Sequence, residues 1–357
     1  MTPPVAAPIE TDALVVGAGP VGLFQVFELG LLGIGAQVVD SLPHVGGQCI
    51  ELYADKPIYD IPALPRCTGR ELIERLQQQI APFDTPFHLA QEVRSVQRQA
   101  DGRFLVASSA GTQWRARAVI VAGGVGSFQP RRLKIDGLAA FEGTQLRYHA
   151  DARADAEVGG LHVLIVGDGD SALEQAISLT ELGPQPAASV TLMHRRDAFG
   201  AAPATLAAVQ RLRESGRLQF VAAQPVGITQ RGGRLTGLVV QEPDASQRTL
   251  PLDALYVLTG LSPKLGPIAD WGLALERKQV VVDTATFETG TPGIFAVGDV
   301  NTYPGKKKLI LSGFHEAALA AYGVAARLHP GTTMPLEYTT SSARLHRVLK
   351  VASEAGP

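Results

Sequence analysis

The feature that most constrains the fold of this chain is a local pattern that occurs twice. Residues 13–22 read ALVVGAGPVG and residues 163–172 read VLIVGDGDSA. Each is a short apolar run, a glycine cluster and then a helical pattern of apolar residues. Another apolar run follows each helical pattern, at 37–39 and at 190–193. Two βαβ units whose starts are 163 − 13 = 150 residues apart predict an α/β protein with two Rossmann-like domains.

The length of 357 residues also fits two domains, since a domain usually has about 100–200 residues. The turn formers in 121–130 (VAGGVGSFQP) predict a crossing between the domains, and a second crossing is expected within 283–292. We therefore expect one domain over 1–127 and 285–357, with the other, 128–284, inserted into it.

Composition and charge exclude several classes of protein. Lys and Arg number 32 against 34 Asp and Glu, a net charge of −2 that argues against a nucleic-acid binder. Two cysteines cannot form a disulfide framework, and we expect a cytoplasmic protein. The first twelve residues hold no basic residue and no apolar stretch runs for about 20 residues, so neither a secretory signal nor a membrane span is expected. The eight histidines show no metal-ligand spacing, and no metal is expected.

The first glycine cluster has the GxGxxG spacing of a dinucleotide-binding loop at Gly17, Gly19 and Gly22. The first glycine permits a tight turn, the second admits a pyrophosphate, and the third lets the helix pack against the strand. Asp40 follows at the end of the next apolar run, 40 − 17 = 23 residues on, where a carboxylate accepts hydrogen bonds from ribose hydroxyls. This half therefore predicts a dinucleotide with a free ribose, either FAD or NAD.

The second cluster places Gly167, Gly169 and Ser171 in a GxGxxA loop. His194, Arg195 and Arg196 stand where the first unit has its acid, and arginine matches a 2′-phosphate. This half therefore predicts NADPH. A carboxylate within the loop, at 168, opposes phosphate binding unless it points away or caps the helix. Two dinucleotide sites in one chain suggest electron transfer from NADPH to a flavin.

The chain resembles the two-domain flavoprotein reductases of the thioredoxin-reductase fold, most of all the ferredoxin/flavodoxin–NADP reductases of that type. Besides the two glycine loops, the resemblance rests on VGGQCIELYADKPIYDIPALP (45–65), HRRDAF (194–199), TPGIFAVGDVNTYPGKKKLILSGFHEAALAAY (291–322) and the tail at 338–341. It implies FAD in the discontinuous domain, NADPH in the inserted domain and a homodimer. Relatives often carry a third arginine where Gly200 stands and glycine where Asp168 stands, which weakens the expected preference for NADPH over NADH.

The resemblance also implies individual roles. The first glycine loop would line the FAD pyrophosphate and Asp40 its ribose, while the C-terminal tail closes over the flavin. Tyr53 and Tyr338 would stack on the two flavin faces, with Tyr53 alternatively serving only as core packing. The other implied flavin contacts are Gln48, Val93 (adenine), Phe128 (hinge), Asp299 (ribityl), Thr340 and Ser341.

The cysteines separate this chain from thioredoxin reductases on the same fold. Those enzymes pass electrons through a C-x-x-C pair, whereas this chain has only Cys49 and Cys67. We therefore expect electrons to pass from the flavin directly to ferredoxin or flavodoxin, with no obligatory catalytic acid or base. A basic surface at 306–308 or 344–350 would suit an acidic carrier. Alternatives are an NAD(P)H oxidoreductase for a quinone, another iron–sulfur protein or a disulfide, and a non-catalytic flavin-binding redox sensor.

Overall fold

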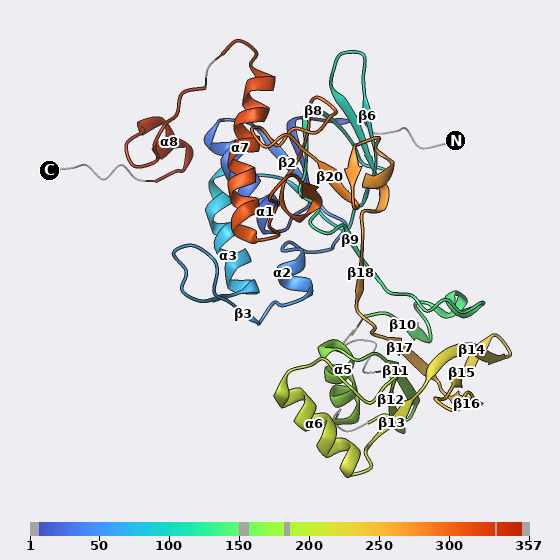
Figure 1. Cartoon of the computed structure of the whole chain (residues 1–357). Coiled ribbons are helices and arrows are strands. Elements are labelled where there is room, and N and C mark those ends of the chain that lie inside the picture. The colour runs from blue at the N-terminus through green and yellow to red at the C-terminus, as the bar shows by residue number, and fades with distance from the viewer. Residues whose placement is uncertain (1–6, 150–156, 182–185, 333, 352–357) are drawn as a thin grey trace. The chain divides into compact units, whose positions relative to one another are not determined.

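The computed structural model describes residues 7–149, 157–181, 186–332 and 334–351, and for 127–130 and 261–264 it describes the backbone only. The chain divides into two compact units, one made of residues 1–127 and 263–357 and the other of residues 128–262. Each unit contains a parallel βαβ arrangement (Figure 1). The predicted fold class, a Rossmann-like unit inserted into a discontinuous one, is confirmed.

The first unit is built on a seven-stranded sheet. Along it run β5 (Phe87–His88), β2 (Ala36–Val39), β1 (Ile9–Val16), β8 (Gln113–Val121), β7 (Phe104–Ser108) and β6 (Val93–Arg98), with β21 (Ile294–Ala296) paired to β8. The strands from β5 to β8, and β21, are parallel, whereas β6 and β7 are antiparallel additions. Helices α1 (Pro20–Leu31), α3 (Gly69–Ile80) and α7 (Ile310–Leu328) pack together beside this sheet (Figure 1).

Local sequence explains where these helices begin and what they bury. Thr68 and Glu71 form a capping box at the start of α3, and Pro20 opens α1 at a position where its missing N–H costs nothing. Small residues line the buried face of α7, which lets it approach α1 closely. The predicted helix at 314–328 in fact begins earlier, at Ile310. The smaller elements of this unit are α2 (Gln48–Glu51), α8 (Ala343–Val348), η1 (Ala81–Phe83), η3 (Gly266–Asp270), η4 (Gly298–Val300), β3 (Pro57–Ile58), β4 (Cys67–Thr68), β19 (Leu275–Glu276), β20 (Gln279–Val281) and β22 (Asn301–Thr302).

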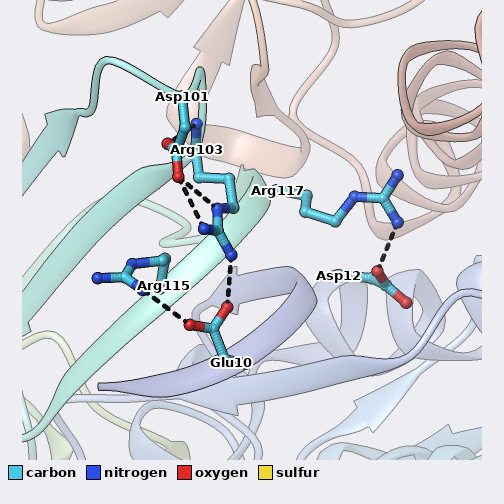
Figure 2. A network of polar contacts seen from close by, with 6 residues as sticks. All are labelled: Glu10, Asp12, Asp101, Arg103, Arg115 and Arg117. Carbon is cyan, nitrogen blue, oxygen red and sulfur yellow. Dashed lines mark hydrogen bonds and ion pairs between the residues drawn. The ribbon is translucent and has the colours of Figure 1, made fainter. Parts of the chain in front are cut away.

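An ion-pair network crosses the end of the sheet that is opposite the glycine loop (Figure 2). Glu10 on β1 accepts hydrogen bonds from Arg103, at 2.9 Å, and from Arg115, at 3.1 Å. Arg117 on β8 pairs with Asp12 and also donates to the backbone carbonyl of Leu328 at the end of α7. These charges are partly exposed, so each pair stabilises the fold by at most about 1 kcal/mol.

The second unit has a five-stranded parallel sheet covered on both faces. Its order is β10 (Leu146–Arg147), β17 (Ala254–Val257), β11 (His162–Val166), β12 (Ser189–His194) and β13 (Leu218–Ala222). One buried cluster joins the sheet to α5 (Asp170–Glu181) and α6 (Pro203–Glu214). A second cluster joins the other face to η2 (Leu138–Phe141) and the antiparallel strands β14 (Gln224–Arg231), β15 (Arg234–Gln241) and β16 (Gln247–Pro251).

The chain crosses between the units on two strands that pair with each other, β9 (Ser127–Pro130) and β18 (Leu261–Lys264). The second crossing therefore lies at 262/263, whereas the sequence analysis places it at 284/285. The intervening residues belong to the first unit because Ile268, Val280 and Val282 are buried in its core, and β20 pairs with β22. Among the helices that the structure describes, none is long and apolar enough to cross a membrane.

Candidate functional site

The first glycine loop connects β1 to α1, and two of its glycines are required by the fold itself. Gly17 has a φ of +118°, and a Cβ added there would lie 2.4 Å from the carbonyl oxygen of Ala122. A Cβ on Gly22 would lie 2.0 Å from the carbonyl oxygen of Gly17. Any side chain at either position would therefore push the strand, loop and helix apart, as the sequence analysis expects for a tight turn and close packing.

Gly19 differs from these two glycines. Its φ is −72°, which any residue can adopt, and a Cβ built on it meets no protein atom within 4 Å. Nothing in the described part of the chain requires glycine at this position. The N-terminus of α1 begins here, and its free N–H groups and dipole favour an anion. An open position at a helix N-terminus is the arrangement that a pyrophosphate requires, so the loop fits a bound dinucleotide.

The predicted acid, Asp40, lies against this loop. Its Oδ2 accepts a hydrogen bond from the backbone N–H of Ala18 at 2.6 Å, and its Oδ1 accepts from Leu42 at 2.8 Å. Each carboxylate oxygen has a further lone pair, so both can still accept a ribose hydroxyl. Burial raises the pKa of Asp40, while the two backbone N–H donors oppose that shift. Val93, the first residue of β6, is buried. It lies near Asp40 in the fold, since the backbone N–H of Gln91 donates to the carbonyl oxygen of Asp40.

Two distant segments reach the same loop. The backbone N–H of Gly46 donates to Ala18, and a Cβ on Gly47 would lie 3.1 Å from the Cα of Gly19. The segment that follows Gly47 begins α2 with Gln48, whose Nε2 donates to Oδ2 of Asp299 at 3.3 Å. The structure therefore brings together Gly19, Gln48 and Asp299, although 251 residues separate the last two.

Tyr53 lies one turn beyond Gln48 and is partly buried against the core. Its hydroxyl accepts a hydrogen bond from the Sγ of Cys49 at 3.6 Å, and burial together with this thiol raises the pKa of Tyr53. The phenol is therefore protonated at physiological pH, and it can act as a neutral stacking ring and a hydrogen-bond donor. The position of Tyr53 is compatible with both of its expected roles, core packing and flavin contact.

The second glycine loop repeats the logic of the first within the other unit. A Cβ on Gly167 would lie 2.4 Å from the carbonyl oxygen of Leu258, whereas a Cβ on Gly169 meets nothing within 4 Å. Ser171, in the first turn of α5, is exposed. Here too the first glycine serves packing and the middle one leaves an open position at a helix N-terminus.

The charges at this loop are arranged in a way that the sequence left open. The Oδ2 of Asp168 lies 3.4 Å from Nε2 of His194, so the carboxylate is directed at the imidazole. The other ring nitrogen of His194, Nδ1, lies 2.9 Å from the carbonyl oxygen of Arg196. Arg195 and Arg196 are exposed and have no ion-pair partner within the described ranges. Two cations are therefore free at the carboxyl end of β12, while the acid of the loop lies beside His194.

The C-terminal tail packs against the end of α1 that is opposite the glycine loop. Arg344 on α8 donates to the carbonyl of Leu31, the last residue of α1, and Lys350 pairs with Asp84. Because α1 has 12 residues, this contact is about 18 Å from the glycine loop at its other end. Figure 1 likewise shows α8 well apart from α2. Within its own chain the tail therefore does not close over the loop; its predicted flavin contacts, Tyr338, Thr340 and Ser341, are exposed.

Phe128 lies on β9, where the side chains are outside the described part of the structure. Lys306, which the sequence groups with a basic surface, is 7 % exposed and pairs with Glu316, a wholly buried residue of α7. The sequence analysis does not predict this pair; the available signal was Glu316, the single carboxylate in the run FHEAALAA. The described residues contain no cluster of three or more side chains that could hold a metal ion.

Known proteins resemble this chain over nearly its whole length. Residues 11–321 match the family described as pyridine nucleotide-disulphide oxidoreductase. A protein of Paracidovorax citrulli named "Ferredoxin--NADP reductase" is 57 % identical over 98 % of each chain. A protein of Albidiferax ferrireducens with the same name is 58 % identical over 97 % of each chain.

Solved structures show the same fold at low identity. A thioredoxin reductase of Lactococcus lactis has a TM-score of 0.62 at 22 % identity, covering 89 % of this chain and 99 % of its own. A bacillithiol disulfide reductase of Staphylococcus aureus has a TM-score of 0.66 at 14 % identity, covering 90 % of this chain and all of its own. The predicted relationship to the two-domain reductases of this fold is confirmed, and the chain belongs to the pyridine nucleotide-disulphide oxidoreductase family.

Proposed function

We propose that this chain is an FAD-dependent reductase that transfers electrons between NADPH and ferredoxin or flavodoxin. The observation that carries the proposal is the open position kept at the middle glycine of each loop, Gly19 and Gly169. The acid beside one loop and the cations beside the other support different dinucleotides at the two positions. The names of the two bacterial relatives, which align over nearly the whole chain, support the same activity.

The residues of the first unit fit FAD. Backbone groups of the first glycine loop, with the N-terminus of α1, would hold its pyrophosphate, and Asp40 would accept from its ribose. The backbone at Val93 would meet the adenine. Gln48 and Asp299, already joined by a hydrogen bond, would bind the ribityl and ring portion, with Tyr53 on one ring face.

The residues of the second unit fit NADPH. The loop from Gly167 to Ser171 would hold the pyrophosphate at the N-terminus of α5. Arg195 and Arg196 would bind the 2′-phosphate, because a guanidinium offers paired donors that match phosphate oxygens. Bound FAD supplies the redox chemistry: it accepts a hydride, which is two electrons and a proton, from NADPH and passes the electrons singly to the carrier.

Burial of both cysteines supports a direct exit of electrons. Cys49 and Cys67 are free, with exposures of 0 % and 2 %, and burial raises the pKa of each thiol. A thiol relay needs an accessible thiolate, which neither provides. Free thiols also suit a reducing compartment, and we place the enzyme in the cytoplasm.

A surface beside Asp299 suits an acidic carrier. With Lys306 turned inward, the exposed cations of that run are Lys307 and Lys308, next to the exposed side chains of Leu309 and Leu311. A small apolar centre rimmed by positive charge would steer a negatively charged partner and exclude water from the contact.

The position of the tail bears on the assembly. Since Tyr338 lies far from the glycine loop of its own chain, a flavin that it covers would belong to a second copy, and we infer a homodimer with tails exchanged in this way. Light scattering measures the mass of the assembly, and hybrids of two variant chains test whether the tails are exchanged. A Tyr338→Ala chain combined with a chain unable to bind FAD should give a hybrid with a covered flavin, whereas tails acting within their own chains give none.

Anaerobic titration tests the proposed function. The purified, FAD-loaded protein should lose its oxidised-flavin absorbance on addition of one equivalent of NADPH, more readily than with NADH. Ferredoxin or flavodoxin added next should restore that absorbance while becoming reduced. No bound flavin, or no loss of absorbance with NADPH, would refute the proposal. Restoration only by a quinone or a disulfide would assign another acceptor.

A further inference from the structure

A buried ion pair lies directly behind the loop that carries Asp299. Glu316 on α7 is wholly buried, and Lys306, which follows β22, is 7 % exposed. The carboxylate of Glu316 accepts hydrogen bonds from the backbone N–H of Gly298 at 2.7 Å, from Asn301 Nδ2 at 2.8 Å and from the hydroxyl of Tyr303 at 3.0 Å. It also accepts from the ammonium group of Lys306.

The pair holds both backbone polar groups of the residue that precedes Asp299. While Glu316 binds the N–H of Gly298, Lys306 donates from Nζ to the carbonyl oxygen of Gly298 at 2.9 Å. Gly298 has a φ of +80°, and a Cβ on it would lie 3.4 Å from Val21, within the first glycine loop. The direction in which the chain enters Asp299 is therefore set by two opposite charges.

Stability alone does not explain such a pair. Removing two charges from water costs several kcal/mol per ion, and well-packed apolar residues in their place are often as stable or more so. What the pair supplies is a defined geometry. Four donors of fixed position converge on Glu316, and the carboxylate has no other partner among the described residues to which it could turn.

We propose that Lys306 and Glu316 are positioning residues for FAD: together they fix the Gly298–Asp299 backbone so that Asp299 and the adjoining Gln48 meet the cofactor. This inference rests on the proposed function, because it takes the site of Asp299 to be the FAD site. Neither residue needs to touch the cofactor, and the effect passes through the two hydrogen bonds to Gly298.

The test compares E316Q, K306M and the double variant K306M/E316Q with wild type and with K307M as a matched control. K307M makes the same change one residue along, at an exposed lysine. For each protein, FAD is removed, the dissociation constant for FAD is measured by flavin fluorescence, and the unfolding of the FAD-free protein is followed in urea. The midpoint potential of the reloaded flavin is recorded as well.

We expect E316Q and K306M each to weaken FAD binding by about tenfold or more, the effect of losing a charge-assisted hydrogen bond. The double variant should weaken FAD binding by less than the product of the two single fold-changes, since neither charge is left buried alone. K307M should bind FAD as wild type does. The potential should rise in E316Q, which removes a negative charge near the flavin, and fall in K306M.

Two results would overturn the proposal. One is unchanged FAD affinity in both single variants despite lower stability, which would make the pair purely structural. The other is FAD binding weakened to the same extent in K307M, which would assign the effect to the loss of surface charge and not to the position of Asp299. If a single variant does not fold, the double variant, which buries no unpaired charge, takes its place. Its affinity for FAD alone then decides, and an unchanged affinity would overturn the proposal. Failure of the wild-type protein to bind FAD would instead refute the proposed function.

Discussion

The middle glycines of the two loops allow a matched pair of substitutions with separable effects. Gly19→Ala and Gly169→Ala each add one methyl group at a position with no protein atom within 4 Å. The cost to the unliganded protein should be small. At Gly19, the residue that caps α1, exchange of glycine for alanine costs about 1 kcal/mol.

The cost to ligand binding should be larger. A methyl group at either position stands where the backbone approaches a pyrophosphate, and it should displace one N–H donor from the phosphate oxygens. Each charge-assisted hydrogen bond is worth about 1.5–3 kcal/mol. Because about 1.4 kcal/mol is a factor of ten, we expect binding to weaken by about 10- to 150-fold.

The assay measures both ligands on both variants. Gly19→Ala should raise the dissociation constant for FAD and leave that for NADPH unchanged once FAD is supplied in excess. Gly169→Ala should do the reverse. Gly22→Ala is the contrasting control, because its Cβ would lie 2.0 Å from a carbonyl oxygen and should destabilise the protein even without ligand. Wild-type affinity for both ligands in both variants would refute the reasoning from open positions.

Three further predictions concern charge. Replacing Arg195 and Arg196 by leucine should raise the KM for NADPH about tenfold or more and leave that for NADH nearly unchanged, as steady-state rates would show; equal losses would argue against 2′-phosphate contact. Asp168→Asn should tighten NADPH binding by up to about fivefold, since exposed charges interact by up to about 1 kcal/mol; titration at low salt would measure this, and weaker binding would contradict it. Burial and the bond to Glu316 raise the pKa of Tyr303 to about 12, so the protonated phenol stabilises the fold below its ordinary pKa of about 10, and this contribution is lost as the pH rises through about 12. The tyrosinate absorbance of the wild type minus that of Tyr303→Phe isolates the titration of this one phenol. That difference should rise near pH 12, and a rise near pH 10 would contradict the prediction.

The elements governed by local spacing could be predicted from the sequence. The two glycine loops, the acid at Asp40 and the cations at Arg195 and Arg196 follow strands and precede helices, so chain geometry alone fixes their edge of the sheet. The fate of Lys306 could not be predicted in this way. Three consecutive lysines look alike in sequence, and only the pairing with Glu316 on a distant helix decides which one turns inward.

The second crossing between the units and the packing of the tail both depend on long-range contacts, which leave no local pattern in the sequence. The second crossing was placed too late because the strands in 263–284 are two or three residues long and are defined by long-range pairing, not by a hydrophobic period. The packing of the tail against α1 could not be predicted because a short exposed segment carries little pattern. Its position depends on a few side-chain contacts, those of Arg344 and Lys350 among them.

The pairing of β9 with β18 has a consequence beyond the fold. Because these neighbouring strands carry the chain out of the first unit and back into it, the second unit is one uninterrupted insertion of 262 − 128 + 1 = 135 residues with its two ends side by side. A short turn could in principle replace all of it without pulling the first unit apart. A single recombination event could therefore exchange one coenzyme-binding module for another, and the preference for a nicotinamide coenzyme could evolve independently of the half proposed to hold the flavin.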